Sequence, residues 1–168
     1  MTPNIRTVTS VDLDQVWCLN DTAVPHVNNL PIDELKRFRQ ISTRFLVAAQ
    51  EGAILGFLVA FSPGADYSSE NYQWFCRSYD DFIYVDRIVV REAARRLGIG
   101  RALYRHLEIG MRGEVPRVTC EVNLRPRNEE SLRMHATLGF FEVGRQDSEG
   151  GAKRVSLLCK PIPTIHQG

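Results

Sequence analysis

Several chemical signatures are missing from this chain of 168 residues. Its four cysteines, Cys18, Cys76, Cys120 and Cys159, lie far apart and form no Cys-x-x-Cys pair. Neither a zinc site nor a disulfide framework is therefore expected, and no metal is expected elsewhere. No apolar run approaches the roughly 20 residues that a membrane-spanning helix needs, and no charged and then apolar leader precedes Ile5. We therefore expect no membrane partner and a reducing, cytoplasmic location.

An excess of one charge is also missing, because 21 Lys and Arg residues stand against 20 Asp and Glu residues. Such a balance gives no broad attraction to polyanions, so no nucleic-acid partner is expected. The length suits one domain with a sizeable core. We place that domain at residues 1–162 and expect a flexible C-terminal tail over 163–168.

One segment carries a clear chemical signal, the run Arg95-Arg96-Leu97-Gly98-Ile99-Gly100. It follows an apolar, strand-like segment over 82–90 and leads into a helical pattern over 101–112. A glycine-rich turn before a helix offers free backbone N–H groups and the positive end of the helix dipole. Glycine also lets an oxyanion approach the backbone closely. The run therefore predicts a site for phosphate or pyrophosphate.

Two common phosphate loops are excluded by residue type. A P-loop needs Lys and then Ser or Thr after its second glycine, but Gly100 is followed by Arg101 and Ala102. The dinucleotide-binding fingerprint needs a third small residue, and Leu103 stands at that position. A nucleotide-binding protein of either kind is therefore not expected.

The run instead resembles the pyrophosphate loop of the GNAT acetyltransferases, whose pattern is Arg/Gln-x-x-Gly-x-Gly/Ala. Arg95, Gly98 and Gly100 fill its defining positions. A stretch further along resembles the late helix of that family, Asn-x-x-Ala-x-x-Leu-Tyr followed by x-x-x-Gly-Phe. Five residues there match in type or size: Asn128, Ser131, Met134, Gly139 and Phe140. Asn128 is also a good N-cap and Gly139 a natural helix stop.

The resemblance implies that acetyl-CoA is the cosubstrate. The residues expected to bind it are the end of the strand, the loop and the start of the late helix: Ile88, Val89, Val90, Arg95, Arg96, Leu97, Gly98, Ile99, Gly100, Arg101, Asn128 and Ser131. Backbone groups of the strand end would hold the pantetheine arm and the acetyl carbonyl. The other arginines nearby, Arg87, Arg91 and Arg105, are expected at the surface as solvated side chains.

The hydrophobic pattern predicts an α/β fold of mixed α+β type. Strands are expected over 5–8, 44–49, 54–61, 82–90, 117–123, 141–146 and 153–159, and helices over 11–19, 33–41, 101–112 and 129–138. This order suits one central mixed sheet with helices on both faces. The resemblance adds that the sheet is mostly antiparallel and that the strand before the phosphate loop splays from its neighbour.

The segment over 62–81 is expected to be an irregular insertion. Its aromatic residues form either a packed cover or a wall of the acceptor pocket. They are Tyr67, Tyr72, Trp74, Phe75 and Tyr79.

Acyl transfer to an amine requires a base, an oxyanion donor and a proton for the leaving thiolate. Asp86 is the first candidate base, because it lies nine positions before Arg95, where some GNAT enzymes carry a catalytic Glu. In a strand it shares a face with Tyr84 and Ile88. The alternative is an Asp that only pairs with a neighbouring Arg. Glu121, on the next strand, is the second candidate base.

His135 departs from the family pattern, because many members carry at that position a Tyr thought to protonate the CoA sulfur. A histidine can also donate a proton near neutral pH. The alternative is a helix histidine with a purely structural hydrogen bond.

Together these features predict an N-acetyltransferase in which a primary amine attacks acetyl-CoA directly within a ternary complex. The acceptor is a small-molecule amine or a protein amino group, and the protein is a monomer or a homodimer. The alternative is a non-catalytic CoA-binding or partner-binding module that has kept the loop.

Overall fold

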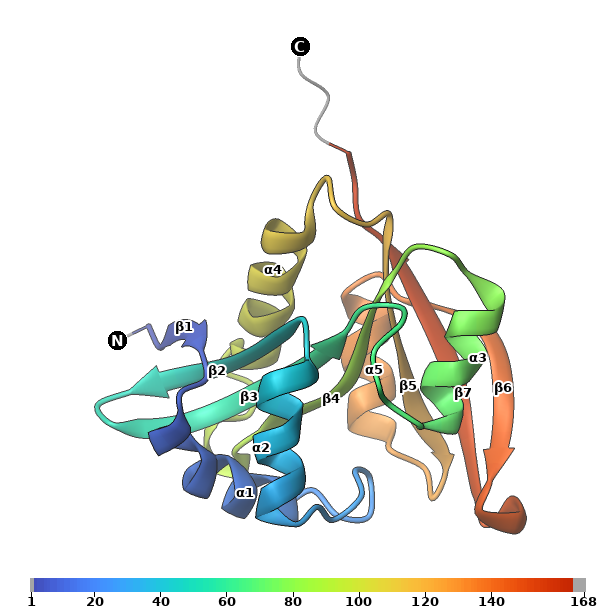
Figure 1. The fold of residues 1–168 in the computed structure, drawn as a ribbon. Coiled ribbons are helices and arrows are strands. Elements are labelled where there is room, and N and C mark those ends of the chain that lie inside the picture. Colours follow the sequence, from blue (N-terminus) through green and yellow to red (C-terminus); the bar gives the residue numbers. More distant parts are fainter. Residues whose placement is uncertain (1, 165–168) are drawn as a thin grey trace. The chain divides into compact units, whose positions relative to one another are not determined.

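The structure is a computed structural model and describes residues 2–164 (Figure 1). The helical elements are η1 (Ser10–Asp12), α1 (Leu13–Asp21), α2 (Ile32–Ile41), α3 (Glu70–Ser78), η2 (Glu92–Ala94), α4 (Ile99–Met111), α5 (Glu129–Thr137) and η3 (Glu149–Gly151). The strands are β1 (Asn4–Thr7), β2 (Arg44–Gln50), β3 (Ala53–Phe61), β4 (Ile83–Val90), β5 (Arg117–Arg125), β6 (Phe141–Ser148) and β7 (Lys153–Pro161).

The chain forms two compact units, Met1–Phe61 with Arg87–Gly110 and Ser62–Asp86 with Met111–Gly168. Strands follow the order β1-β2-β3-β4 in the first unit and β4-β5-β7-β6 in the second. Strand β4 belongs to both units: the part from Arg87 onward lies in the first, and the part up to Asp86 lies in the second. The pairings β1 with β2, β2 with β3, β5 with β7 and β6 with β7 are antiparallel, and β4 with β5 is parallel. The expected α/β fold with a mostly antiparallel sheet is confirmed.

In the first unit, helices cover both faces of the sheet. Phe38 of α2 packs edge-on against Phe61 of β3, with ring centroids 5.3 Å apart. On the other face, Gly56 of β3 lies against Ile99 and Leu103 of α4. A side chain at Gly56 would meet the Cγ2 atom of Ile99 at 3.2 Å, so the missing Cβ lets α4 approach the strand closely.

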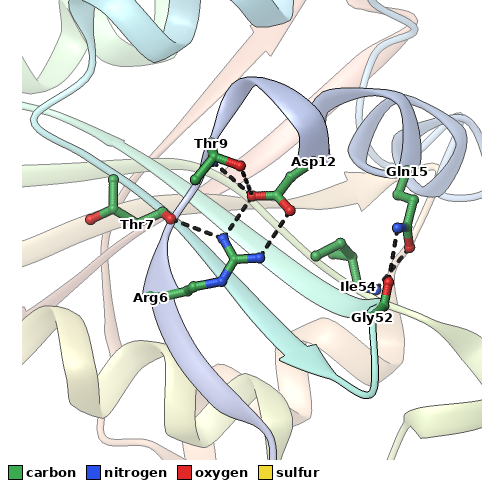
Figure 2. A network of polar contacts seen from close by, with 7 residues as sticks. All are labelled: Arg6, Thr7, Thr9, Asp12, Gln15, Gly52 and Ile54. Carbon is green, nitrogen blue, oxygen red and sulfur yellow. Dashed lines mark hydrogen bonds and ion pairs between the residues drawn. The ribbon is translucent and has the colours of Figure 1, made fainter.

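A polar network fixes the start of α1 in the first unit (Figure 2). The guanidinium of Arg6 donates to both carboxylate oxygens of Asp12, at 2.7 and 2.9 Å. The amide N–H of Thr9 donates to the same carboxylate at 2.7 Å. Further along the helix, Gln15 bonds the hairpin turn between β2 and β3 through Gly52 O and Ile54 N. One end of α1 is thus tied to β1 and to that turn.

In the second unit, β7 lies between β5 and β6 and pairs antiparallel with both. The parallel ladder between β4 and β5 joins Ile83–Val85 to Val118–Cys120. It ends at Val85 and Cys120, although β5 continues to Arg125. This early end of the pairing is what a splayed strand pair predicts.

The segment over 62–81 differs from the irregular insertion expected, because it contains helix α3. Ser69 caps the helix by accepting from the amide of Tyr72. Tyr72 and Phe75 are buried and lie against Tyr84 of β4, with centroids 5.4 and 5.8 Å from it. Trp74 lies over Gly144 of β6, and α3 runs beside β6 and β7 (Figure 1). The aromatic residues of this helix are therefore a packed cover of the second unit.

Strand β7 ends at Pro161, and the next residue, Ile162, is buried and bonds the carbonyl of Pro116 through its amide. The single domain over 1–162 stays a prediction. Of the tail expected over 163–168, residues 165–168 lie outside the described residues.

Candidate active site

The predicted pyrophosphate loop lies in the first unit as an exposed turn between η2 and α4. Arg96 and Gly98 adopt positive φ values of 66° and 80°, and the helix begins at Ile99. The amide of Ala102 donates to Gly98 O at 2.9 Å, so Gly98 lies at the N-terminus of the helix. The amides of Ile99, Gly100 and Arg101 belong to the first turn, where helical N–H groups have no intrahelical acceptor. This arrangement can bind an anion such as pyrophosphate.

The loop is basic and open to solvent. Arg95, Arg96 and Arg101 are exposed, and Leu97 is 73% exposed. Arg95 also donates through Nε to Val90 O at 3.3 Å, which ties the loop to the end of β4. Three arginines close to the helix N-terminus suit a ligand that carries several phosphate charges.

The strand residues expected to hold the pantetheine arm lie at the end of β4. The carbonyl of Val89 lies beside Gly56 of β3, and the amide of Arg91 donates to Leu55 O at 2.8 Å. This edge of the strand therefore faces β3. Regular alternation along a strand directs the backbone groups of Ile88 and Val90 to the opposite edge, which suits the expected role.

Arg87 is a correction to the sequence analysis. It is 5% exposed rather than solvated. Its guanidinium donates to the side-chain oxygens of Asn20 and Asn28, at 2.9 and 2.6 Å, and lies 5.6 Å from the ring centroid of Phe38. Arg87 thus fixes the connection between α1 and α2. Arg91 is exposed, as expected, and its guanidinium also donates to Ile54 O.

Asn128 and Ser131 begin helix α5 in the second unit. The side chain of Asn128 accepts from the Ser131 amide at 3.2 Å, as expected for an N-cap. At the other end, Gly139 has a φ of 98° and the amide of Phe140 bonds His135 O, which closes the helix. The structure thus explains Asn128 and Ser131 as residues that begin the helix, and their role in binding a cofactor stays a prediction.

His135 is 2% exposed and packs edge-on against Phe140. Its Nδ1 atom lies 2.7 Å from Ser131 O. Because a carbonyl only accepts, Nδ1 carries the proton, and Nε2 carries the lone pair of a neutral ring. Burial lowers the pKa of His135, and the bond to Ser131 opposes this in part. This geometry favours the structural alternative over a proton donor.

The two candidate bases lie in one cluster of the second unit. The phenol of Tyr67 donates to Oδ1 of Asp86. The phenol of Tyr84 donates to Glu121 and lies 2.9 and 2.7 Å from its two carboxylate oxygens. Tyr84 is fully buried, and burial together with the charges of Glu121 and Asp86 holds its pKa well above the usual value. Tyr84 therefore stays protonated and acts as a permanent hydrogen-bond donor.

Sequence reasoning missed both tyrosines as partners of the carboxylates. Tyr84 was recognisable in principle, since it shares a strand face with Asp86. Tyr67 lies 19 positions before Asp86, in a segment without a regular pattern. Only the folded insertion brings its hydroxyl to that carboxylate.

A separate hollow of about 750 Å³ lies in the first unit between α1 and η2. It is lined by Asp14, Gln15, Cys18, Leu19, Thr22, Arg91, Glu92 and Ala93. None of these is a predicted site residue, and two carboxylates offset the single arginine. The hollow does not suit pyrophosphate.

Over residues 2–164, no group of three or more His, Cys, Asp and Glu side chains is arranged to hold a metal ion. Within the same residues, no helix is long and apolar enough to cross a membrane.

Known proteins resemble this chain in sequence and in fold. Residues 14–140 match the model of the acetyltransferase (GNAT) family. An N-alpha-acetyltransferase of Sulfurisphaera tokodaii is 27% identical over 143 residues, which cover 83% of this chain and 80% of the relative.

Two solved structures share the fold. Ard1 from Thermoplasma volcanium superimposes with a TM-score of 0.78 at 18% identity, covering 97% of this chain and 99% of that one. The putative acetyltransferase yncA from Salmonella typhimurium, determined with acetyl-CoA, has a TM-score of 0.72 at 15% identity, with coverage of 100% and 98%.

The chain shares its fold with solved structures that include a putative acetyltransferase determined with acetyl-CoA. The match over residues 14–140 shows the family: the chain belongs to the GNAT family of acetyltransferases.

Proposed function

We propose that the protein transfers the acetyl group of acetyl-CoA to the α-amino group at a polypeptide N-terminus. The observation that carries the proposal is the 95–100 loop, with Gly98 in the left-handed region directly before the N-terminus of α4. Its free amides and the arginines around it would hold the pyrophosphate. The residues thus fit acetyl-CoA as cosubstrate.

Support for an N-terminal acceptor comes from the sequence relative, whose name is N-alpha-acetyltransferase. The other class of acceptor predicted from the sequence is a small-molecule amine. Both are primary amines that must be deprotonated before attack, so the same chemistry serves either. The four cysteines are free thiols, which supports the expected reducing, cytoplasmic location.

In the proposed reaction, Asp86 removes a proton from the acceptor ammonium group. The amine nitrogen then attacks the thioester carbonyl carbon, the C–N bond forms, and the oxyanion collapses to break the C–S bond. The CoA thiolate leaves and takes up the second proton, which the attacking nitrogen loses as it becomes the amide nitrogen, so that the products are the acetylated amine and CoA with a free thiol. Ile88 and Val89 at the end of β4 are the expected sources of the oxyanion donor, and the backbone N–H of Ile88 suits the role better because that of Val89 faces β3.

Asp86 is the first candidate for the base and Glu121 the second. Both carboxylate oxygens of Glu121 lie within 2.9 Å of the Tyr84 hydroxyl, whereas Tyr67 binds Oδ1 of Asp86. The tyrosine contact of Asp86 is thus made through one oxygen rather than two, which favours Asp86 as the base. His135, the expected acid, is better explained as a structural residue, because its buried neutral ring holds its proton toward Ser131 O.

The test is an acetyl-transfer assay with acetyl-CoA and three sets of acceptors. These are short peptides with free N-termini, the same peptides blocked at the N-terminus but carrying lysine, and small amines. Products are identified by mass spectrometry. We expect acetylation of the free N-termini alone, and a loss of about 100-fold or more in kcat/KM for Asp86→Asn.

Glu121→Gln is the matched control for the base. If it abolishes transfer while Asp86→Asn does not, the second candidate is the base. Acetylation of only the blocked peptides or the small amines would overturn the N-terminal acceptor. Binding of acetyl-CoA without transfer to any acceptor would favour the non-catalytic alternative.

A further inference from the structure

The insertion over 62–81 brings a tyrosine to the proposed base. The hydroxyl of Tyr67 donates to Oδ1 of Asp86 at the middle of β4. Both residues are half-buried. A hydrogen bond from a phenol to a carboxylate oxygen is charge-assisted, and such a bond is stronger than one between two neutral groups.

The backbone around Tyr67 is held from both sides. Its amide donates to Ala65 O at 2.8 Å, and its carbonyl accepts from Nε2 of Gln73 at 3.0 Å. The hydroxyl of Tyr72 donates to Ser62 O at 2.6 Å and accepts from the Ala65 amide at 3.0 Å. The rings of Tyr67 and Tyr72 also pack together, 5.6 Å apart. The turn that carries Tyr67 is therefore ordered by α3.

Helix α3 is itself anchored to the second unit. Trp74 packs onto Gly144 of β6, and Nε2 of Gln146 donates to Oδ1 of Asn71 at 3.0 Å. The chain of contacts thus runs from β6 through α3 and the 62–69 turn to one oxygen of Asp86. Groups whose supporting residues are locked in this way are held in one rotamer.

We propose that Tyr67 is a positioning residue of the acetyl transfer. Its hydrogen bond holds the carboxylate of Asp86 in one orientation for removal of the proton. This inference rests on the proposed function, in which Asp86 is the base. A carboxylate that turns about its χ2 angle would have the correct orientation for only part of the time. The insertion then has a role in catalysis as well as in packing.

The test compares Tyr67→Phe, Asp86→Asn and the double variant, with acetyl-CoA and the best acceptor of the panel above. Tyr79→Phe is the control, because it removes a hydroxyl from the same insertion and keeps a ring that stacks on Phe75. We measure kcat, KM, the Kd for acetyl-CoA and the melting temperature.

For Tyr67→Phe we expect kcat to fall about tenfold, the effect of losing one charged hydrogen bond. KM and the Kd for acetyl-CoA should stay close to the wild-type values, and the melting temperature should fall only by the amount that one lost hydrogen bond explains. In the Asp86→Asn background the same change should have no further effect on kcat, because Tyr67 acts through Asp86. Tyr79→Phe should match the wild type.

A kcat for Tyr67→Phe within twofold of the wild type would overturn the inference while leaving the proposed function intact. An equal loss of kcat with and without Asp86 would overturn it as well, since Tyr67 would then act independently. If the wild-type protein binds acetyl-CoA but acetylates no acceptor, the proposed function fails, and the positioning role fails with it.

Discussion

The carboxylate of Asp12 offers a stability prediction whose size follows from the structure. The pKa of Asp12 is lowered from 3.8 to about 2, first by the hydrogen bonds from Arg6 and then by those from Thr9. A difference of nearly two pKa units corresponds to about 2.5 kcal/mol of stability. The Arg6 side chain is 36% exposed, so solvent screening reduces this to about 1 to 2 kcal/mol.

The perturbation is Asp12→Asn, which removes the charge and keeps an oxygen that can accept from the Thr9 amide. A folded-state pKa below the unfolded value means that the ionised group stabilises the fold above pH 3.8. This contribution is then lost as the pH falls through about 2. Urea unfolding at pH 7 should therefore show the variant about 1 to 2 kcal/mol less stable. The difference should shrink steadily at pH 4, 3 and 2.

Asp14→Asn is the control, since Asp14 lies in the first turn of the same helix and is exposed. It should change the free energy of unfolding by less than about 1 kcal/mol, as a helix-end charge does. Arg6→Gln should reproduce most of the Asp12→Asn effect, and the double variant should add little. A difference between wild type and Asp12→Asn that is the same at every pH would refute the reasoning.

Three further predictions concern the loop, the insertion and the buried histidine. Gly98→Ala should weaken acetyl-CoA binding about fivefold in a calorimetric titration, because alanine lets the free loop leave the left-handed conformation, and restoring it on binding costs about 1 kcal/mol. Gly52 has the same φ of 80° and equally open surroundings, so Gly52→Ala is the control and should leave the affinity for acetyl-CoA unchanged. An equal loss of affinity in the two variants would contradict a role for the loop. Gly144→Ala should lower the free energy of unfolding in urea by about 1 to 3 kcal/mol, because its Cβ would lie 2.7 Å from Trp74. If Gly144→Ala lowers the free energy of unfolding by less in a Trp74→Ala background than in the wild type, the contact is confirmed. An equal decrease in both backgrounds would exclude it. His135 has a lowered pKa, so the wild type should lose stability as the pH falls below the ordinary value of 6.5. Urea unfolding between pH 7.5 and 5 should show no such loss for His135→Gln. If the free energies of unfolding of the wild type and the variant change with pH in the same way, the prediction is contradicted.

The parts of the fold that could be predicted from the sequence are specified by residues close together in the chain. The 95–100 loop and helix α5 are each specified by residues within a dozen positions, such as Gly98 and the pair Asn128 and Gly139. Capping residues and glycines at positive φ act through neighbouring backbone, so their pattern is visible in the sequence.

The parts that were missed depend on distant partners. Helix α3 has nine residues, and its Trp74 lies against Gly144, 70 positions further along the chain. Arg87 is buried because Asn20 and Asn28 stand 67 and 59 positions before it. Tyr67 reaches Asp86 only after the insertion has folded. No local periodicity encodes any of these contacts.

The contact between Trp74 and Gly144 has a consequence for evolution. With Trp74 on its inner face, α3 lies so close to β6 that residue 144 has no room for a side chain. Positions 74 and 144 should therefore change together among homologues. A chain with a smaller residue at 74 should tolerate a side chain at 144, and one with the tryptophan should carry the glycine as well.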